Sequence, residues 1–135
     1  MTYYISALLD LGLQDAIDAT EAALKEEGFG VVTRIDMAQT FKAKIGVDFH
    51  PYVILGACNP KLAYEALKLE DKVGTMLPCN IIVQETGSEH SEVAAIDPVA
   101  SMQAINNDRL QQAAGEVRSR LERVIQRLRS GDQPS

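Results

Sequence analysis

Two cysteines are the residues of this sequence best suited to chemistry, and both lie in one short stretch. Cys58 precedes Asn59 and Pro60, and Cys79 precedes Asn80. An asparagine followed by proline is typical of a helix start, so a helix is predicted directly after Cys58. Because a helix N-terminus favours a thiolate, Cys58 is a candidate for binding a soft metal, carrying a persulfide or sensing oxidants.

Each cysteine also has a plainer interpretation as a packing residue. Free cysteine is among the residue types most often buried, and burial opposes formation of the thiolate. Cys79 shares one face of a predicted strand with Leu77, Ile81 and Val83, which favours a position in the core. If the strands that carry the cysteines are neighbours, the two thiols could form a redox pair or supply two metal ligands.

The sequence contains no complete metal-binding or catalytic motif. Zinc requires about four ligands, and only Asp48, His50 and His90 lie near enough in sequence to complete a set with the cysteines. A Cys-x-x-Cys motif, a nucleophile elbow, a phosphate-binding loop and a dinucleotide fingerprint are all absent. We therefore expect no metal, no cofactor and no catalytic residue, which favours a binding module over an enzyme.

Five residues form the candidate ligand site. Asn59 is first of all the expected helix cap, and Asn80 lies on the strand face opposite Cys79, where it could satisfy an edge or line a pocket. Gly56 leaves space beside the sheet for a ligand or for a helix. The candidate ligand-binding residues are Gly56, Cys58, Asn59, Cys79 and Asn80.

The hydrophobic pattern predicts the elements that must position these residues. Strands are predicted at residues 2–9, 29–35, 52–57, 75–85 and 92–96, the last two as a hairpin. Helices are predicted at residues 13–27, after Asp36, after Asn59, after Asp97 and at about 109–129. This order predicts an α+β fold, with a mixed or mainly antiparallel sheet and its large helices on one face.

Local signals add detail to this prediction. Pro78 inside the fourth strand predicts an edge or a bulge at that point. The third strand is apolar on both faces, which is typical of an interior strand covered on both sides. Asp108 is expected to cap the last helix. The apolar stripe of that helix covers either the chain's own sheet or a second subunit, and its crowded arginines form either a solvated face or a docking patch.

Composition and charge limit the possible classes of protein. A chain of 135 residues with 46% apolar residues predicts one domain over residues 1–129, with a disordered tail over 130–135. The net charge of −6 disfavours nucleic acid as a partner. The sequence shows neither a signal peptide nor a long apolar run, so we expect no membrane partner. Two cysteines without an export signal favour a cytoplasmic protein with free thiols.

The segment GVDFHPYVILGACNP, with MLPCNIIV and the Asp97-Pro98 turn after it, resembles the uncharacterised family catalogued as domain of unknown function 302. The resemblance covers the chain from Tyr4 to about Leu128. It implies a curved antiparallel sheet of TATA-binding-protein-like topology, a bacterial or archaeal origin and a homodimer. It implies no reaction, and a shared topology does not imply DNA binding.

We therefore expect a small cytoplasmic protein that acts as a non-enzymatic homodimeric module, either binding an unidentified small ligand or serving as an accessory protein. Strands that are apolar on both faces, with helices on only one, leave apolar surface to cover, which favours the homodimer. The alternative is a thiol-dependent function. It would be sulfur transfer, redox sensing or soft-metal binding at Cys58, with or without Cys79.

Overall fold

The alternating apolar segments form one antiparallel sheet in a computed structural model, which describes residues 2–131. The strands are β1 (Tyr4–Leu9), β2 (Gly30–Asp36), β3 (Tyr52–Cys58), β4 (Cys79–Gly87) and β5 (His90–Ile96), in the spatial order β1-β5-β4-β3-β2. The helices are α1 (Leu13–Glu26), α2 (Met37–Ile45), α3 (Pro60–Leu69), the 3-10 helix η1 (Asp71–Met76), α4 (Pro98–Ser101) and α5 (Asp108–Arg129). The predicted α+β class with a five-stranded antiparallel sheet is confirmed.

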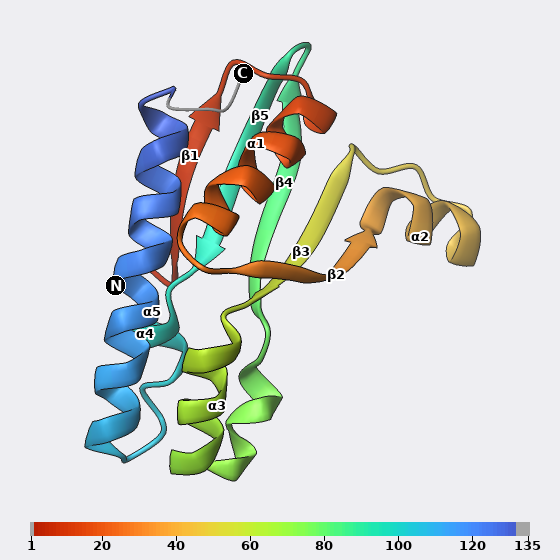
Figure 1. Ribbon diagram of the computed structural model, residues 1–135. Coiled ribbons are helices and arrows are strands. Elements are labelled where there is room, and N and C mark those ends of the chain that lie inside the picture. The colour runs from red at the N-terminus through yellow and green to blue at the C-terminus, as the bar shows by residue number, and fades with distance from the viewer. Residues whose placement is uncertain (1, 132–135) are drawn as a thin grey trace.

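Helices α1 and α5 pack on one face of the sheet and bury the main hydrophobic core (Figure 1). Val93 and Ala95 of β5 point into this core and are fully buried, as the two-residue period of a strand requires. Leu121 and Val124 of α5 are fully buried against it. The apolar stripe of α5 therefore covers the chain's own sheet, which decides between the two interpretations of that stripe.

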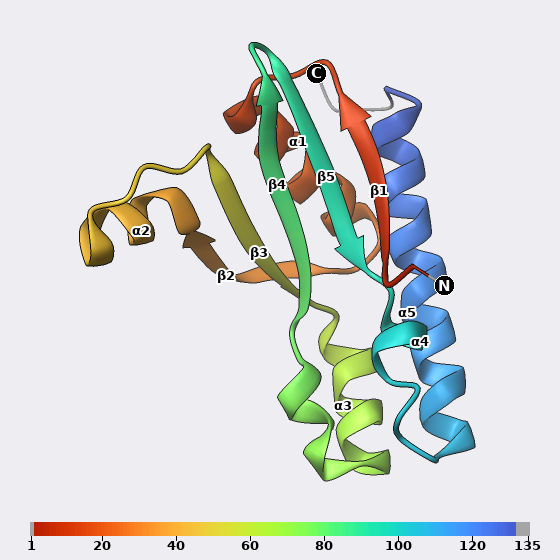
Figure 2. The ribbon, with the colours of Figure 1, turned by 180° about the vertical axis from the view of Figure 1, so that it is seen from behind.

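The other face of the sheet carries no helix from residues 2–131 (Figure 2). We call it the open face. Its side chains are Tyr4, Ser6 and Leu8 of β1, Glu92, Ala94 and Ile96 of β5, Asn80, Ile82 and Gln84 of β4, and Tyr52 and Ile54 of β3. Strand β3 is interior, as its apolar faces predict, but the protomer covers only one of these faces. Helices cover only the side of Val53 and Leu55.

Two local predictions are wrong for identifiable reasons. The sequence places Pro78 inside the fourth strand at an edge or bulge, but Pro78 precedes β4, which lies between β3 and β5. A proline just before a strand does not interrupt the hydrogen bonds between strands, so an interior strand tolerates it. The cap of α5 is Asn107 rather than Asp108, because Asn107 Oδ1 accepts a hydrogen bond from the Leu110 backbone N–H at 3.0 Å.

Helix α2 and the loop after it extend beyond the edge of the sheet (Figures 1 and 2). We call residues 37–51 the arm. Asp36 caps α2 by accepting a hydrogen bond from the Gln39 N–H at 2.9 Å, and Gly46 ends it at a φ of 68°, both as predicted. None of the nine residues of α2 is buried, so its apolar side is only partly covered within the protomer.

The arginine-rich end of α5 is paired within the chain. The Glu27 carboxylate, whose side chain is only 8% exposed, lies 2.8 Å from Arg123 Nε and 3.4 Å from Arg127 Nη2. Arg118 Nε lies 2.9 Å from the carboxylate of Asp97. These cations are compensated by nearby carboxylates, which disfavours the interpretation of this region as a docking patch for an acidic partner.

The end of the chain is described only in part. Ser130 and Gly131 close α5 through backbone hydrogen bonds to Gln126 and Leu128. The rest of the predicted disordered tail, residues 132–135, lies outside the described residues. Within residues 2–131, every helix is too short or too polar to cross a membrane.

Candidate functional site

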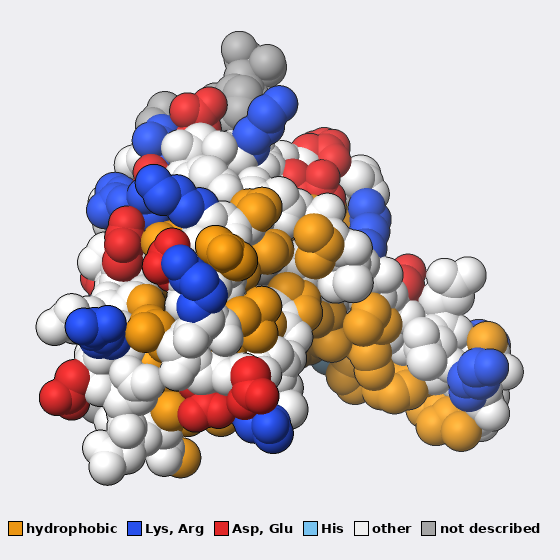
Figure 3. All heavy atoms as spheres, turned by 60° about the horizontal axis from the view of Figure 1, so that its bottom comes forward, with side chains coloured by type: hydrophobic (Ala, Val, Ile, Leu, Met, Phe, Trp, Pro, Cys, Tyr) orange, Lys and Arg blue, Asp and Glu red, His pale blue; other side chains and the backbone are white. Residues whose placement is uncertain are grey.

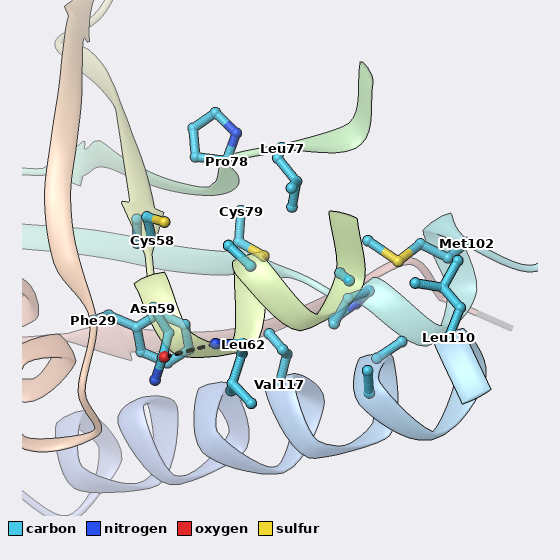
Figure 4. Close-up of a pocket in the computed structure, with 16 residues that line it drawn as sticks. Phe29, Cys58, Asn59, Leu62, Leu77, Pro78, Cys79, Met102, Leu110 and Val117 are labelled. Atoms are coloured by element: carbon cyan, nitrogen blue, oxygen red, sulfur yellow. Dashed lines mark hydrogen bonds between the residues drawn. The ribbon is translucent and has the colours of Figure 1, made fainter. Parts of the chain in front are cut away.

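Cys58 and Cys79 lie at the adjoining ends of two neighbouring strands. Cys58 is the last residue of β3, Cys79 is the first of β4, and Ala57 pairs with Cys79 across the ladder. Both thiols are free; Cys79 is buried and Cys58 is half-buried. Their strands are neighbours, which is the condition that the sequence sets for bringing the two thiols together. Both cysteines line one pocket (Figure 4).

This pocket lies between α3, α5, α4 and the ends of β3 and β4. Small side chains from three of these elements keep it open, namely Ala57, Ala63, Ala66, Ala113 and Ala114. Larger apolar side chains form its walls, including Phe29, Leu62, Leu77, Met102, Leu110 and Val117. It offers about 40 Å³ of free space to molecules the size of water, whereas one water needs roughly 10–15 Å³ by the same measure. The pocket therefore has room for a group of a few atoms.

Burial sets the protonation state of Cys79. Loss of solvation raises the pKa of the Cys79 thiol from 9.0 to about 11, and the neighbouring Cys58 adds to the rise. Cys79 is therefore a neutral thiol at pH 7. In this form it packs as a small hydrophobic group with a weak donor, whereas nucleophilic attack and metal ligation both need the thiolate.

Asn59 positions helix α3 at the mouth of the pocket. Its Oδ1 accepts a hydrogen bond from the Leu62 N–H at 3.2 Å, which confirms the predicted cap. Its Nδ2 lies close to Gly28, in the turn after α1. A Cβ added to Gly28 would be only 3.0 Å from that atom. The amide of Asn59 thus holds the start of α3 in place while its side chain forms part of the pocket wall.

Gly56 is required by close packing. A Cβ at this position would collide with Thr33 Oγ1 on the neighbouring strand β2 and would lie 2.7 Å from Pro78 Cγ. The space that the sequence suggests beside Gly56 is therefore filled by Thr33 and Pro78. Gly56 lets these side chains approach the backbone of β3 closely, and it does not itself line the pocket.

Asn80 lies on the opposite side of the sheet from Cys79, and the structure separates it from the pocket. It lines a wide hollow on the open face, together with Tyr52, Gln84 and Glu92. This hollow offers about 350 Å³ to water-sized molecules. The sequence leaves two roles open for Asn80, one at an edge and one in the lining of a pocket. The structure shows Asn80 lining a hollow.

The three residues considered as further metal ligands all have other partners. The pairs are Asp48–Lys42 at 2.9 Å, His50–Gln84 at 2.7 Å and His90–Asp10 at 3.0 Å. No group of three or more His, Cys, Asp or Glu side chains within residues 2–131 is arranged to hold a metal ion. The thiols and these three residues therefore do not converge on one site.

Sequence reasoning missed the contribution of the C-terminal third of the chain to the pocket. Met102, Leu110 and Val117 are recognisable in the sequence as apolar residues with helical spacing. That spacing shows which residues share a helix face, but it does not show which distant segment they contact. The pair Ala113-Ala114 is the available signal, because two adjacent small residues in a long helix permit a close approach or leave a gap.

Comparisons with known proteins agree with this fold. The family model described as "Domain of unknown function DUF302" matches residues 5–128. No curated protein matches the chain significantly. A solved structure, "Crystal structure of uncharacterized conserved protein DUF302 from Bacillus stearothermophilus", is 28% identical with a TM-score of 0.88, and the match covers 96% of this chain and 100% of that chain. The family match extends over most of the sequence and confirms the resemblance noted there, so this protein belongs to the DUF302 family.

Proposed function

We propose that this protein is a non-enzymatic, homodimeric module of the cytoplasm that binds a small apolar molecule in the pocket beside Cys58 and Cys79. The observation that carries the proposal is the lining of this pocket. Apart from the two thiols and the amide of Asn59, its side chains are hydrocarbon or thioether, and none of them is charged. A pocket of this kind binds through dispersion and release of water rather than through ion pairs.

The same lining disfavours charged and strongly polar ligands. A phosphate, carboxylate or ammonium group in this pocket would lose its hydration without gaining a compensating partner. The thiol of Cys79 is neutral at pH 7 and does not supply a charge. The two free thiols support a reducing compartment, which is the basis for proposing the cytoplasm.

The test is a titration with dissolved xenon, an uncharged apolar probe, followed by NMR of alanine and methionine methyl groups. We expect saturable shifts at Ala63, Ala114 and Met102, which line the pocket. Ala63→Leu fills the mouth of the pocket and should abolish these shifts. Ala104→Leu is the matched control, because Ala104 is exposed and lies outside the pocket. Shifts that are absent, or that persist unchanged in Ala63→Leu, would contradict the proposal.

A thiol-dependent function is the second candidate, and the unequal burial of the two cysteines supports it. Cys58 is half-buried and lines the same pocket as the buried, neutral Cys79. One accessible thiol facing an apolar pocket is suited to carrying sulfur, sensing oxidants or binding a soft metal. Intact mass of protein purified without reductant should then show an added sulfur, oxygen or metal on wild type but not on Cys58→Ser. An unmodified Cys58 that is also no faster to alkylate than Cys79 would reject this candidate.

A further inference from the structure

A second apolar surface lies on the far side of the molecule from the α1 and α5 layer. Most of the large hydrophobic side chains that are exposed within residues 2–131 belong to the open face, to β2 or to the arm. They are Tyr3, Tyr4, Leu8, Val32, Ile35, Ile45, Val47 and Phe49. Scattered exposed hydrophobic residues are ordinary, whereas those that join into one surface mark an interaction site.

Ring contacts join the arm to the open face. The Phe41 and Phe49 rings lie 5.3 Å apart edge to face, and the Phe49 and Tyr52 ring centroids are 6.1 Å apart. Tyr52 in turn lines the hollow on the open face. Seen from below in the space-filling view, hydrophobic side chains also run from the body of the molecule onto the arm (Figure 3). These ring contacts link the apolar side of the arm to the hollow on the open face.

Helix α2 is only partly covered by its own protomer. Its apolar residues Met37, Phe41 and Ile45 recur every four positions and so share one side of the helix. None of its nine residues is buried in the protomer, and Ile45 is 67% exposed. A helix shorter than about 12–15 residues is marginal in water unless an apolar side is packed against something.

The geometry points to a second copy of this chain as the occupant of this surface. Two copies meet with their open faces toward each other, and the arm of each lies over the open face of the other. This arrangement is self-complementary under a two-fold axis, because each protomer supplies both an arm and a face that receives the arm of the other. It deepens the proposed function by naming the interface of the homodimer, and it uses residues outside the pocket of Cys58 and Cys79.

Area and charge support this partner. The exposed fractions of the eight hydrophobic residues correspond to roughly 800 Å² per protomer, which is about the share of each partner in a stable interface. The hollow is lined by one charged residue, Glu92, whose carboxylate accepts a hydrogen bond from Gln84 Nε2 at 2.8 Å. Two copies can therefore meet here without placing clusters of like charge together, although each carries a net charge of −6.

Sedimentation velocity over a concentration series tests the interface. We expect the full-length protein to be a dimer at micromolar concentration. Ile45→Glu in the arm and Leu8→Glu on the open face should each weaken the dimer by more than about thirtyfold, the effect of charging a central interface residue. Tyr64→Glu is the matched control, because Tyr64 is 63% exposed on α3, away from this surface, and it should leave the dimer unchanged.

Crosslinking distinguishes this interface from any other contact. A photoreactive residue at position 45, in a mixture of ¹⁵N-labelled and unlabelled protein, should yield mixed-isotope crosslinks to peptides of β1 or β4. A monomer at all concentrations, a dimer that both glutamate variants leave intact, or crosslinks only within one chain would each overturn the inference. A monomer at all concentrations would also remove the homodimer from the proposed function. None of these results would affect xenon binding, so the interface and the apolar pocket are tested separately.

Discussion

The reactivity of Cys79 is the prediction that follows most directly from the burial of the site. Desolvation raises its pKa from 9.0 to about 11, which is a preference of roughly 3 kcal/mol for the neutral thiol at about 1.36 kcal/mol per pKa unit. At pH 7 the thiolate fraction falls about hundredfold relative to an unshifted thiol. A more basic thiolate is also a better nucleophile, which raises the reaction rate by about tenfold and offsets part of this loss. A net loss of about tenfold therefore remains, before restricted access slows the reaction further.

Timed alkylation of the native protein measures this effect. Iodoacetamide is added at a series of pH values from 7 to 11.5, and the two cysteines are quantified separately by peptide mapping. Cys58 should react first, and the rate at Cys79 should still be rising above pH 10. Circular dichroism at each pH confirms that the protein remains folded. In Cys58→Ser the high midpoint of Cys79 should persist, because desolvation is the larger cause of the shift and Cys58 the smaller.

Two outcomes would refute this reasoning. A midpoint near 9 for Cys79 in the folded protein would show that the thiol is solvated and that the pocket is open to water at that point. Equal rates at Cys58 and Cys79 near pH 7 would show that the difference in burial between them has no chemical consequence. Either result would also weaken the proposal of an apolar pocket, because Cys79 forms one of its walls.

Three further predictions concern stability. Replacing Asn59 by alanine removes the cap of α3 and should lower the free energy of unfolding by about 1 kcal/mol in urea titrations. Asn59→Ser should retain most of this stability. An unchanged free energy of unfolding in Asn59→Ala would refute the capping role. Gly56→Ala introduces a Cβ against Thr33 and Pro78 and should cost about 1–3 kcal/mol, whereas an unchanged urea midpoint would show that the strands can separate without penalty. Cys79 binds its proton more tightly in the folded state than in the unfolded state. Its contribution to the free energy of unfolding is therefore complete below pH 9 and is lost as the pH rises toward 11. Wild type should therefore lose about 2 kcal/mol more than Cys79→Ala between pH 9 and 11, and parallel pH profiles would contradict the shift.

The sequence predicts most of the fold because the signals involved are local. The cap-and-proline pairs at Asn59 and at Asp97 start helices as expected, and both side chains accept hydrogen bonds from the first turn. The alternation of apolar residues in β5 places Val93 and Ala95 in the core. Such signals act over a few residues, so they can be identified without knowledge of distant contacts.

Other features depend on contacts that local patterns do not specify. The stripe of α2 has the spacing of a buried helix face, yet none of its residues is buried. Asn80 and Cys79 are adjacent in sequence but face opposite sides of the sheet, so the candidate site divides into a pocket and a separate hollow. Pro78 is compatible with an interior strand only because β4 begins one residue later, a boundary that the hydrophobic pattern does not define.

A crystal structure of the protein under xenon pressure would show directly whether the pocket beside Cys58 and Cys79 takes up an apolar ligand. We expect a xenon atom in the pocket between α3 and α5, in contact with Ala63, Ala114 and Cys79, and we expect it to be absent in Ala63→Leu. Ala104→Leu should retain it. A pocket that remains empty under pressure, or one occupied by ordered water while xenon binds elsewhere, would contradict the conclusion that this site is built for a small apolar ligand.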